Sequence, residues 1–269
     1  MKRPVITLLT DFGLADHYVG AMKGIILGIC PDAQLVDISH EITRYAITEA
    51  AFTLSQAWTC FPEGTVHLVV VDPGVGSARR PILVEASGHH FVAPDNGVLT
   101  MLYDAIPAGV FEQHIEIREI TAARFFHQPV SRTFHGRDIF APVAAHLADG
   151  LAAGEFGNRI GDPVRLGFAK PARTGPKTWA GTILKVDHFG NLITNLDSET
   201  WQRLASEPFE MQVGEILVSG MASNYAEMQR GGLFVIAGSA GFLEVSLNRG
   251  SAAKTAGAGP GDTVEVRFL

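Results

Sequence analysis

The segment VVVDPGVGSARRPI, residues 69–82, carries the first residues whose types and spacing could do chemistry. A strand rich in β-branched residues ends at Asp72, and a glycine-containing loop leads to Arg79 seven residues later. Ligands of open α/β sheets bind beyond the carboxyl ends of the strands, so Asp72 is placed to contact one. The alternative is a plain turn, because Asp-Pro-Gly is common turn chemistry. A phosphate-binding loop is disfavoured, since no GxxxxGK followed by Ser or Thr is present.

Two further polar residues stand next to predicted elements. Asp11, in the segment TDFG, directly follows a strand and could bind the two hydroxyls of a ribose, although an N-cap role for Asp11 or Asp16 is an equal alternative. His135 lies just before a predicted helix, and a histidine can relay protons near neutral pH. The alternative for His135 is an ordinary surface or core histidine.

A third group lies in VDHFGNLITNL, residues 186–196. Asp187 and Asn191 flank Phe189 in a predicted turn at a strand end, and a carboxylate, an amide and an aromatic ring could hold a zwitterionic amino acid. Ordinary hairpin chemistry is the alternative. None of the ten histidines forms HExxH, and Cys30 and Cys60 form no CxxC, so no metal site is predicted.

The elements that must position these residues change in type along the chain. Strands are predicted at 3–9, 34–39 and 65–72, helices at 17–29, 46–59, 98–105 and 136–150, and a hairpin around Gly88. Strands that alternate with helices indicate an α/β domain over residues 1–166 with a largely parallel, Rossmann-like sheet. Residues 167–178 are rich in Pro, Gly and Lys and are predicted to be a linker. Short strand-like runs then predict a small all-β barrel domain over residues 179–269.

The bulk composition excludes several classes of protein. The chain has 269 residues, a formal net charge of −7 and 46% hydrophobic residues, which is typical of a globular protein and unlike a nucleic-acid binder. No run approaches the roughly 18 apolar residues of a membrane span, and the apolar stretch before Asp11 is too short for a signal peptide. Two isolated cysteines fit a reducing compartment. We therefore expect a cytoplasmic protein that binds neither nucleic acid nor membrane.

Taken together and in this order, the motifs resemble the S-adenosylmethionine hydroxide adenosyltransferase family, which is related to fluorinases and chlorinases. The matching segments span nearly the whole chain: TDFG at 10–13, the loop from Asp72 to Arg79, APDNG at 93–97, TFHGRDIFAP at 133–142, DHFGNLITN at 187–195 and GSAGFLEVSLNRGSA at 238–252. The resemblance implies an α/β domain followed by a β-barrel, no cofactor beyond the substrate, and a homotrimer with active sites at subunit interfaces.

The resemblance also implies roles for individual residues. It makes Asp72, Arg79 and His135 a catalytic group that handles the attacking water, and Asp11 the ribose-binding carboxylate. The remaining residues implied in substrate binding are Phe12, Tyr45, Asp95, Asn96, Phe134, Asp187, Phe189, Asn191, Tyr225, Ser239, Glu244, Asn248 and Arg249.

The implied reaction is hydrolysis of S-adenosyl-L-methionine to adenosine and L-methionine by attack of water or hydroxide at the ribose C5′. Two alternatives stay open at this point. Halide transfer on the same scaffold is disfavoured by Asp72, His135 and Gly136, because halogenases carry neutral residues and a serine there. A non-catalytic sensor of adenosine or S-adenosylmethionine would keep the pocket and need no catalytic group. The sequence does not decide which group accepts the proton of the water, or whether adenosine stays bound after turnover.

Overall fold

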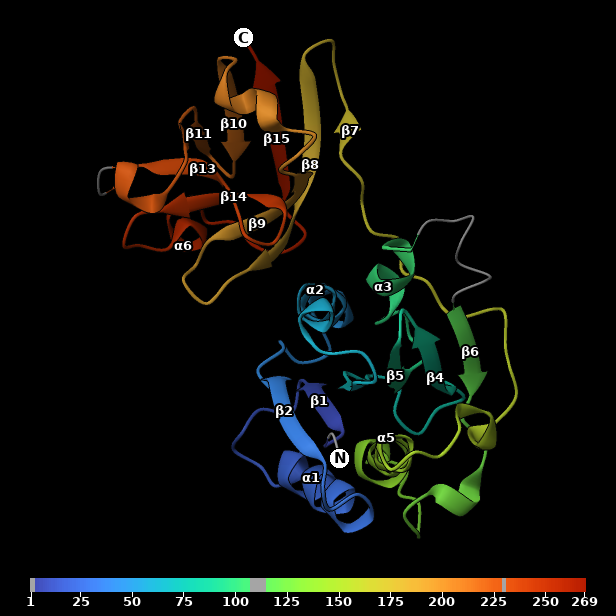
Figure 1. Cartoon of the computed structure of the whole chain (residues 1–269). Coiled ribbons are helices and arrows are strands. Elements are labelled where there is room, and N and C mark those ends of the chain that lie inside the picture. Colours follow the sequence, from blue (N-terminus) through green and yellow to red (C-terminus); the bar gives the residue numbers. More distant parts are fainter. Residues whose placement is uncertain (1–2, 107–114, 229–230) are drawn as a thin grey trace. The chain divides into compact units, whose positions relative to one another are not determined.

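The computed structural model describes residues 3–106, 115–228 and 231–269, and it divides into two compact units, residues 1–166 and 167–269 (Figure 1). Residues 167–178, predicted to be a linker, fall within the second unit, where the short strand β7 (Ala172–Arg173) pairs with β8. Each unit is described by itself.

The first unit is built on a six-stranded mixed sheet with the order β2-β1-β3-β5-β4-β6. Its strands are β1 (Val5–Thr10), β2 (Gln34–Ser39), β3 (Val66–Val70), β4 (Pro81–Ala86), β5 (His89–Pro94) and β6 (Ile115–Glu119). The pairs β1–β2, β1–β3 and β3–β5 are parallel, whereas β4 runs antiparallel to both β5 and β6. The sheet is therefore only partly parallel, and its order is not the Rossmann order.

The departure from a parallel sheet comes from the hairpin β4–β5. Ser87 and Gly88 both have positive φ, as a two-residue hairpin loop requires, and they reverse the chain between Ala86 and His89. The hairpin predicted around Gly88 is confirmed. Its first strand, β4, then becomes the partner of β6, a pairing that no local pattern predicts.

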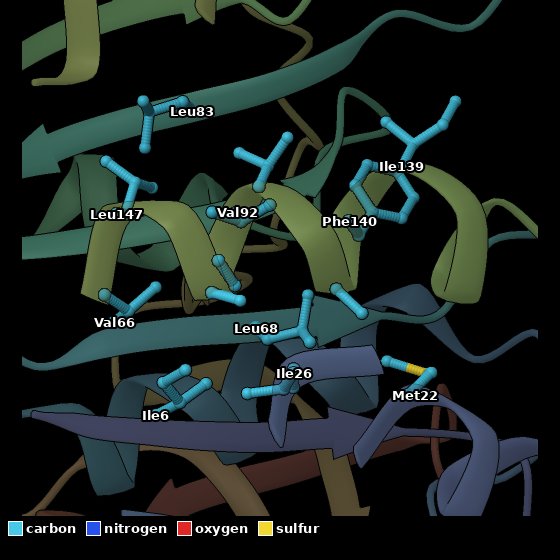
Figure 2. Close-up of a cluster of buried hydrophobic side chains, with 14 of the residues drawn as sticks. Ile6, Met22, Ile26, Val66, Leu68, Leu83, Val92, Ile139, Phe140 and Leu147 are labelled. Atoms are coloured by element: carbon cyan, nitrogen blue, oxygen red, sulfur yellow. The ribbon is translucent and has the colours of Figure 1, made fainter. Parts of the chain in front are cut away.

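Helices cover both faces of this sheet, and each face has its own hydrophobic core. The helices of the unit are α1 (Tyr18–Ile29), α2 (Ile47–Ala57), α3 (Thr100–Asp104) and α5 (Ala141–Ala148), which a single π-helical turn (Gly136–Phe140) precedes. Short 3-10 turns lie at Trp58–Cys60, Ala123–Phe125 and Ala153–Phe156. Helices α1 and α5 pack on one face, where Met22, Ile26 and Leu147 meet Ile6 and Leu68 (Figure 2). Helices α2 and α3 cover the other face.

The second unit is a single β-sheet of nine strands that curls into a half-barrel. Its strands are β7, β8 (Thr178–Val186), β9 (Leu192–Asp197), β10 (Phe209–Val213), β11 (Ile216–Val218), β12 (Met221–Ala222), β13 (Leu233–Ala237), β14 (Phe242–Leu247) and β15 (Thr263–Phe268). The order along the sheet is β11-β10-β15-β8-β9-β14-β13-β12, with β7 beside β8. All pairings are antiparallel except β12–β13.

Only short helical segments accompany this sheet in the described part of the unit. They are α6 (Ala252–Ala256) and 3-10 turns at Gln202–Ala205 and Tyr225–Glu227. A core that includes Leu192, Val235, Leu243 and Val264 fills the inside of the curl. The all-β prediction holds as a curled sheet rather than as a closed barrel: among the described strands, β11 and β12 end the path without pairing with each other.

Candidate active site

The loop after β3 brings Asp72 and Arg79 into a buried ion pair. Nε of Arg79 donates to Oδ1 of Asp72 at 3.1 Å, and Nη2 donates to Oδ2. Both side chains are buried, at 7% and 5% exposure. The guanidinium also lies over the ring of Phe140, 5.2 Å from its centroid. A bidentate pair of this kind fixes both partners in one plane.

His135 joins this pair from the turn that precedes α5. Nη2 of Arg79 lies 3.2 Å from Nδ1 of His135. Because a guanidinium can only donate, Nδ1 must be the acceptor, and the neutral ring carries its hydrogen on Nε2. Burial lowers the pKa of His135, and the neighbouring positive charge of Arg79 lowers it further. The ring is therefore neutral at pH 7.

The donors of Arg79 are not all used by these contacts. Nε and Nη2 serve Asp72 and His135, while Nη1 is buried and has no hydrogen-bond partner among the described residues. A buried donor without an acceptor is costly, so this group is suited to hold an oxygen atom supplied from outside the protein.

The backbone of the loop holds the ion pair in place. Gly76 has a φ of +75°, and a β-carbon there would overlap with the carbonyl oxygen of Arg132. The hydroxyl of Ser77 donates to the carbonyl of Gly74 at 2.6 Å and accepts from the amide of Arg79 at 3.2 Å. Gly76 therefore permits the close approach between the loop that carries Asp72 and the segment that carries His135.

Sequence reasoning missed Asp138, which fixes the segment around His135. Its buried carboxylate accepts from the amide of Ser131 at 2.7 Å and from Nε of Arg137 at 2.6 Å. The sequence offered only an acidic residue in the first turn of the helix predicted at 136–150, and its complete burial is seen only in the structure.

Asp11 lies at the end of β1, where its carboxylate has one hydrogen-bond partner among the described residues. Oδ2 accepts from the amide of Tyr45 at 2.8 Å. Tyr45 has a φ of +67°, which is unusual for a residue other than glycine, and its side chain is exposed. A cavity of 450 Å³ opens beside Asp11 and Phe12. The strained backbone and the cavity together mark this loop as a candidate ligand contact.

His40 braces the same loop, a role that no sequence pattern signalled. Its Nδ1 lies 2.8 Å from Oγ1 of Thr10, and its carbonyl accepts from the amide of Gly13 at 2.8 Å. Phe12 and Phe134 pack edge to face, with ring centroids 6.0 Å apart, so the aromatic residues predicted near the ribose carboxylate do come together.

Asp95 and Asn96 make contacts that brace the fold of the first unit. Oδ2 of Asp95 accepts two hydrogen bonds from Arg80, and Oδ1 accepts from the amide of Val164 at 2.8 Å. Nδ2 of Asn96 donates to the carbonyl of Val71 at 2.8 Å, directly before Asp72. The bond from Asn96 supports the end of β3, and the bonds to Asp95 fix Arg80 at the end of the loop that carries Asp72.

The second unit contains a cavity of 730 Å³ that collects every residue predicted from this part of the chain. Its lining includes Asp187, Phe189, Asn191, Tyr225, Ser239, Glu244, Asn248 and Arg249. Ile236 and Leu247 contribute an apolar wall, which no sequence motif signalled.

A turn at residues 187–191 builds one side of this cavity. Oδ1 of Asp187 accepts from the amides of Phe189 and Asn191 at 2.9 and 2.8 Å, and Oδ2 accepts from Nδ2 of Asn191 at 2.9 Å. Gly190 takes a φ of +87° against Ser251, where a side chain would clash. Phe189 is 76% exposed and presents its ring at the cavity. The turn therefore holds an amide and an aromatic ring ready for a ligand.

Two titratable groups next to this turn, Tyr225 and Glu244, have shifted pKa values. The hydroxyl of Tyr225 donates to Oε2 of Glu244 at 3.3 Å. Burial raises the pKa of Glu244, and the charge of Asp187 raises it further, while the bond from Tyr225 lowers it. Burial also raises the pKa of Tyr225.

No group of three or more His, Cys, Asp or Glu side chains within the described part of the chain is arranged to hold a metal ion. In the same residues, no helix has the length and apolar character needed to cross a membrane.

The two sites define a class of protein with two parts. An α/β unit carries a polar cluster around an arginine, and a β unit carries a cavity with aromatic side chains that can hold a small molecule. The chain belongs to the SAM hydroxide adenosyltransferase family: the model of the N-terminal domain matches residues 6–157, and that of the C-terminal domain matches residues 181–265.

Curated relatives are similar over nearly the whole chain. An (R)-S-adenosyl-L-methionine hydrolase of Thermus thermophilus is 38% identical over 99% of this chain and 100% of its own, and one of Salinispora arenicola is 36% identical over 98% and 97%. A fluorinase of an Actinoplanes species is 31% identical over 72% of each chain. The crystal structure of an uncharacterized conserved protein from Thermotoga maritima superposes with a TM-score of 0.86 and 38% identity, covering 97% of this chain and 99% of the other.

Proposed function

We propose that this protein hydrolyses S-adenosyl-L-methionine to adenosine and L-methionine. The observation that carries the proposal is the buried Nη1 of Arg79, which has no acceptor among the described residues and is fixed between Asp72 and His135. An incoming water molecule or hydroxide supplies the missing acceptor. Membership of the family and the similarity to curated hydrolases support the same reaction.

In the proposed reaction, the oxygen of water forms a bond to the ribose C5′ while the C5′–S bond breaks. The sulfur takes the bonding pair and leaves as the neutral thioether of methionine, and one proton is released from the water. Arg79 donates to the attacking oxygen, Asp72 accepts a hydrogen bond from it, and His135 relays the proton. The protein's main contribution is to align the water with the C5′–S bond.

We assign substrate binding to both units. In the first unit, Asp11 accepts hydrogen bonds from the ribose hydroxyls, beside Phe12, Tyr45 and Phe134. In the second unit, the cavity holds the remainder of the molecule between Phe189 and Tyr225, with polar contacts from residues of its lining. Asp95 and Asn96 are assigned to positioning, because Asn96 binds the carbonyl of Val71 and Asp95 holds Arg80, the neighbour of Arg79 in the chain.

The family resemblance supports three wider proposals. The enzyme uses no cofactor beyond its substrate, acts in the cytoplasm without a nucleic-acid or membrane partner, and forms a homotrimer whose active sites lie at subunit interfaces. Sedimentation of the purified protein tests the trimer, and a loss of activity on dilution below the dissociation constant of the oligomer tests the shared sites.

Product analysis tests the reaction. Pure protein is incubated with S-adenosyl-L-methionine in oxygen-18 water, with and without chloride or fluoride. We expect adenosine with the label at its 5′ oxygen and no 5′-halogenated nucleoside, since Asp72 accepts a hydrogen bond from the O–H of water or hydroxide, whereas a halide ion has no hydrogen to donate. Halogenated product would favour the halide transferase, and binding without turnover would favour the sensor. Unlabelled adenosine would contradict attack by water at C5′.

A further inference from the structure

Thr10, the last residue of β1, belongs to a set of polar contacts that ends at the backbone beside Asp11. Its Oγ1 lies 2.8 Å from Nδ1 of His40 and accepts a hydrogen bond from the amide of Phe12 at 3.3 Å. The carbonyl of His40 accepts from the amide of Gly13 at 2.8 Å. Thr10 is completely buried and does not line the cavity beside Asp11. It can therefore act on a ligand there only through the backbone that carries Asp11.

Asp37, on β2, determines which nitrogen of His40 carries the hydrogen. Nε2 of His40 lies 3.0 Å from Oδ1 of Asp37, in a contact that is bent rather than well aligned. Although burial raises the pKa of Asp37, its contacts with Lys23 and His40 lower it overall, so the carboxylate is ionised at pH 7. An ionised carboxylate only accepts, so Nε2 carries the hydrogen and Nδ1 of the neutral ring accepts from the hydroxyl of Thr10. Asp37, His40 and Thr10 thus form one directed series of contacts, the His40 chain.

The His40 chain fixes the backbone of the loop while the side chain of Asp11 is fixed separately. The hydroxyl hydrogen of Thr10 is used by His40, so the lone pairs of its oxygen remain for the amide of Phe12. Oδ2 of Asp11 accepts from the amide of Tyr45 at 2.8 Å, whereas no described residue donates to Oδ1. The carboxylate is therefore anchored on one side and has an oxygen available to a ligand on the other.

Resting on the proposed function, we propose that the His40 chain is a positioning device for Asp11 and that it sets the affinity of the enzyme for the ribose hydroxyls. Two hydroxyls bind one carboxylate well only when its orientation is fixed, which a buried and fully connected hydrogen-bond network provides. The ribose hydroxyls gain no charge during attack at C5′, so Asp11 holds the substrate and the transition state equally. Loss of the chain should therefore raise KM and leave kcat nearly unchanged.

Thr10→Val tests the proposal in binding and in kinetics. Valine keeps the shape of threonine but offers neither a donor to His40 nor an acceptor to the amide of Phe12. We expect the affinity for adenosine, measured by calorimetry, to fall about tenfold and KM for S-adenosyl-L-methionine to rise by a similar factor, with kcat within about twofold of the wild type. Thr10→Ser keeps the hydroxyl and should recover most of the affinity.

Thr7→Val is the matched control. Thr7 lies on the same strand, is equally buried, and its Oγ1 lies 2.8 Å from Nδ1 of another histidine, His67. The substitution removes the same kind of buried bond within the strand rather than at its end, so stability should fall while KM and the affinity for adenosine stay unchanged. A merely structural role for Thr10 would make the two variants alike, with kcat lowered by loss of folded enzyme and KM unaltered. That result overturns the proposal.

Two amide variants of His40 test the direction of the chain. The short side chain of asparagine can place its oxygen near the position of Nδ1, where it accepts from Thr10, whereas glutamine reaches the position of Nε2 and contacts Asp37 alone. We expect His40→Asn to lose less affinity for adenosine than His40→Gln. Equal losses, or a greater loss in His40→Asn, would mean that the bond to Thr10 is not the one that matters, and the proposal is wrong.

The same measurements separate this inference from the proposed function. Calorimetry with adenosine needs no turnover, so a protein that binds adenosine without hydrolysing S-adenosyl-L-methionine overturns the hydrolase and still tests the His40 chain. If Asp11→Ala leaves the affinity for adenosine unchanged, the chain has no ribose carboxylate to position, and the inference fails even where the enzyme hydrolyses its substrate. A wild-type protein that neither binds adenosine nor hydrolyses S-adenosyl-L-methionine overturns both.

Discussion

At the scale of single residues, the proposed chemistry depends on how Arg79 distributes its hydrogen bonds. It engages both oxygens of Asp72 and one nitrogen of His135, while Nη1 has no acceptor within the described part of the chain. Motif spacing in the sequence drew attention to all three residues. The spacing could not predict which atoms of these side chains bond to one another. That arrangement depends on how the loop packs against Arg132, which only a glycine at position 76 permits.

Replacing Asp72 should separate catalysis from binding. Asp72→Asn sets an NH₂ group against the N–H bonds of Arg79 and removes the carboxylate that orients the water. We expect kcat to fall about a hundredfold or more, while the affinity for adenosine changes little, because the ribose is assigned to Asp11. Kinetics and calorimetry measure the two effects. The control is Asp104→Asn, which removes an exposed carboxylate of the same unit that pairs with Arg165. Equal losses of rate and affinity would make Asp72 a binding residue.

The pH dependence of the rate should report His135. Its pKa lies below 6.5 because burial and Arg79 both disfavour the charged ring. Protonation would also place an N–H of His135 against the N–H of Arg79. We therefore expect kcat/KM to be constant around pH 7 and to fall only as the pH drops below 6.5. An acid limb centred at or above 6.5, or the same limb in His135→Gln, would contradict this assignment.

At the scale of elements, the sequence predicted local units and missed their partners. The hairpin at Gly88 was visible because glycine beside a small polar residue favours a two-residue loop. The pairing of β4 with β6 could not be predicted from the sequence, because the two strands are about 30 residues apart. Their buried side chains would also fit a pairing in either direction. For the same reason, the alternation of strands and helices suggested a more parallel sheet than the mixed one observed.

The first sheet also buries a pair of histidines whose titration should affect stability. His67, on β3, lies between Oγ1 of Thr7 at 2.8 Å and Nδ1 of His89 at 3.2 Å, and its ring stacks on Phe91. Burial, together with the nearby charge of His89, lowers the pKa of His67 to about 3. Between pH 6.5 and about 3, the unfolded chain therefore binds a proton at His67 that the native state does not.

It follows that stability should be lost as the pH falls through this window, by up to about 1.4 kcal/mol per pH unit from this one group. Urea unfolding at several pH values measures the slope. His67→Gln should reduce the slope by about one proton, whatever its effect on absolute stability. The control, His17→Gln, alters an exposed histidine of the same unit and should leave the slope nearly unchanged. An unchanged slope in His67→Gln would mean that His67 takes up its proton in the native state.

At the scale of the whole molecule, the chain consists of two units that each bury their own core. The change near residue 166 could be seen in the sequence, because alternating strands and helices differ in hydrophobic periodicity from a series of short strands. The curl of the second sheet was harder to anticipate, since short strands of even spacing predict a closed barrel as readily as an open one.

Separating the units is the last test. A fragment of residues 1–166 contains the complete sheet order β2-β1-β3-β5-β4-β6, Asp11 and the cluster around Arg79. Because its core is its own, we expect it to fold, with a circular dichroism spectrum of mixed α/β type and a cooperative unfolding transition. It lacks the cavity of the second unit, so the substrate loses the contacts that align C5′ with the water, and hydrolysis should fall below detection. A folded fragment that hydrolyses S-adenosyl-L-methionine at the rate of the full chain would mean that the first unit holds a complete active site. The cavity around Phe189 and Tyr225 would then need another explanation.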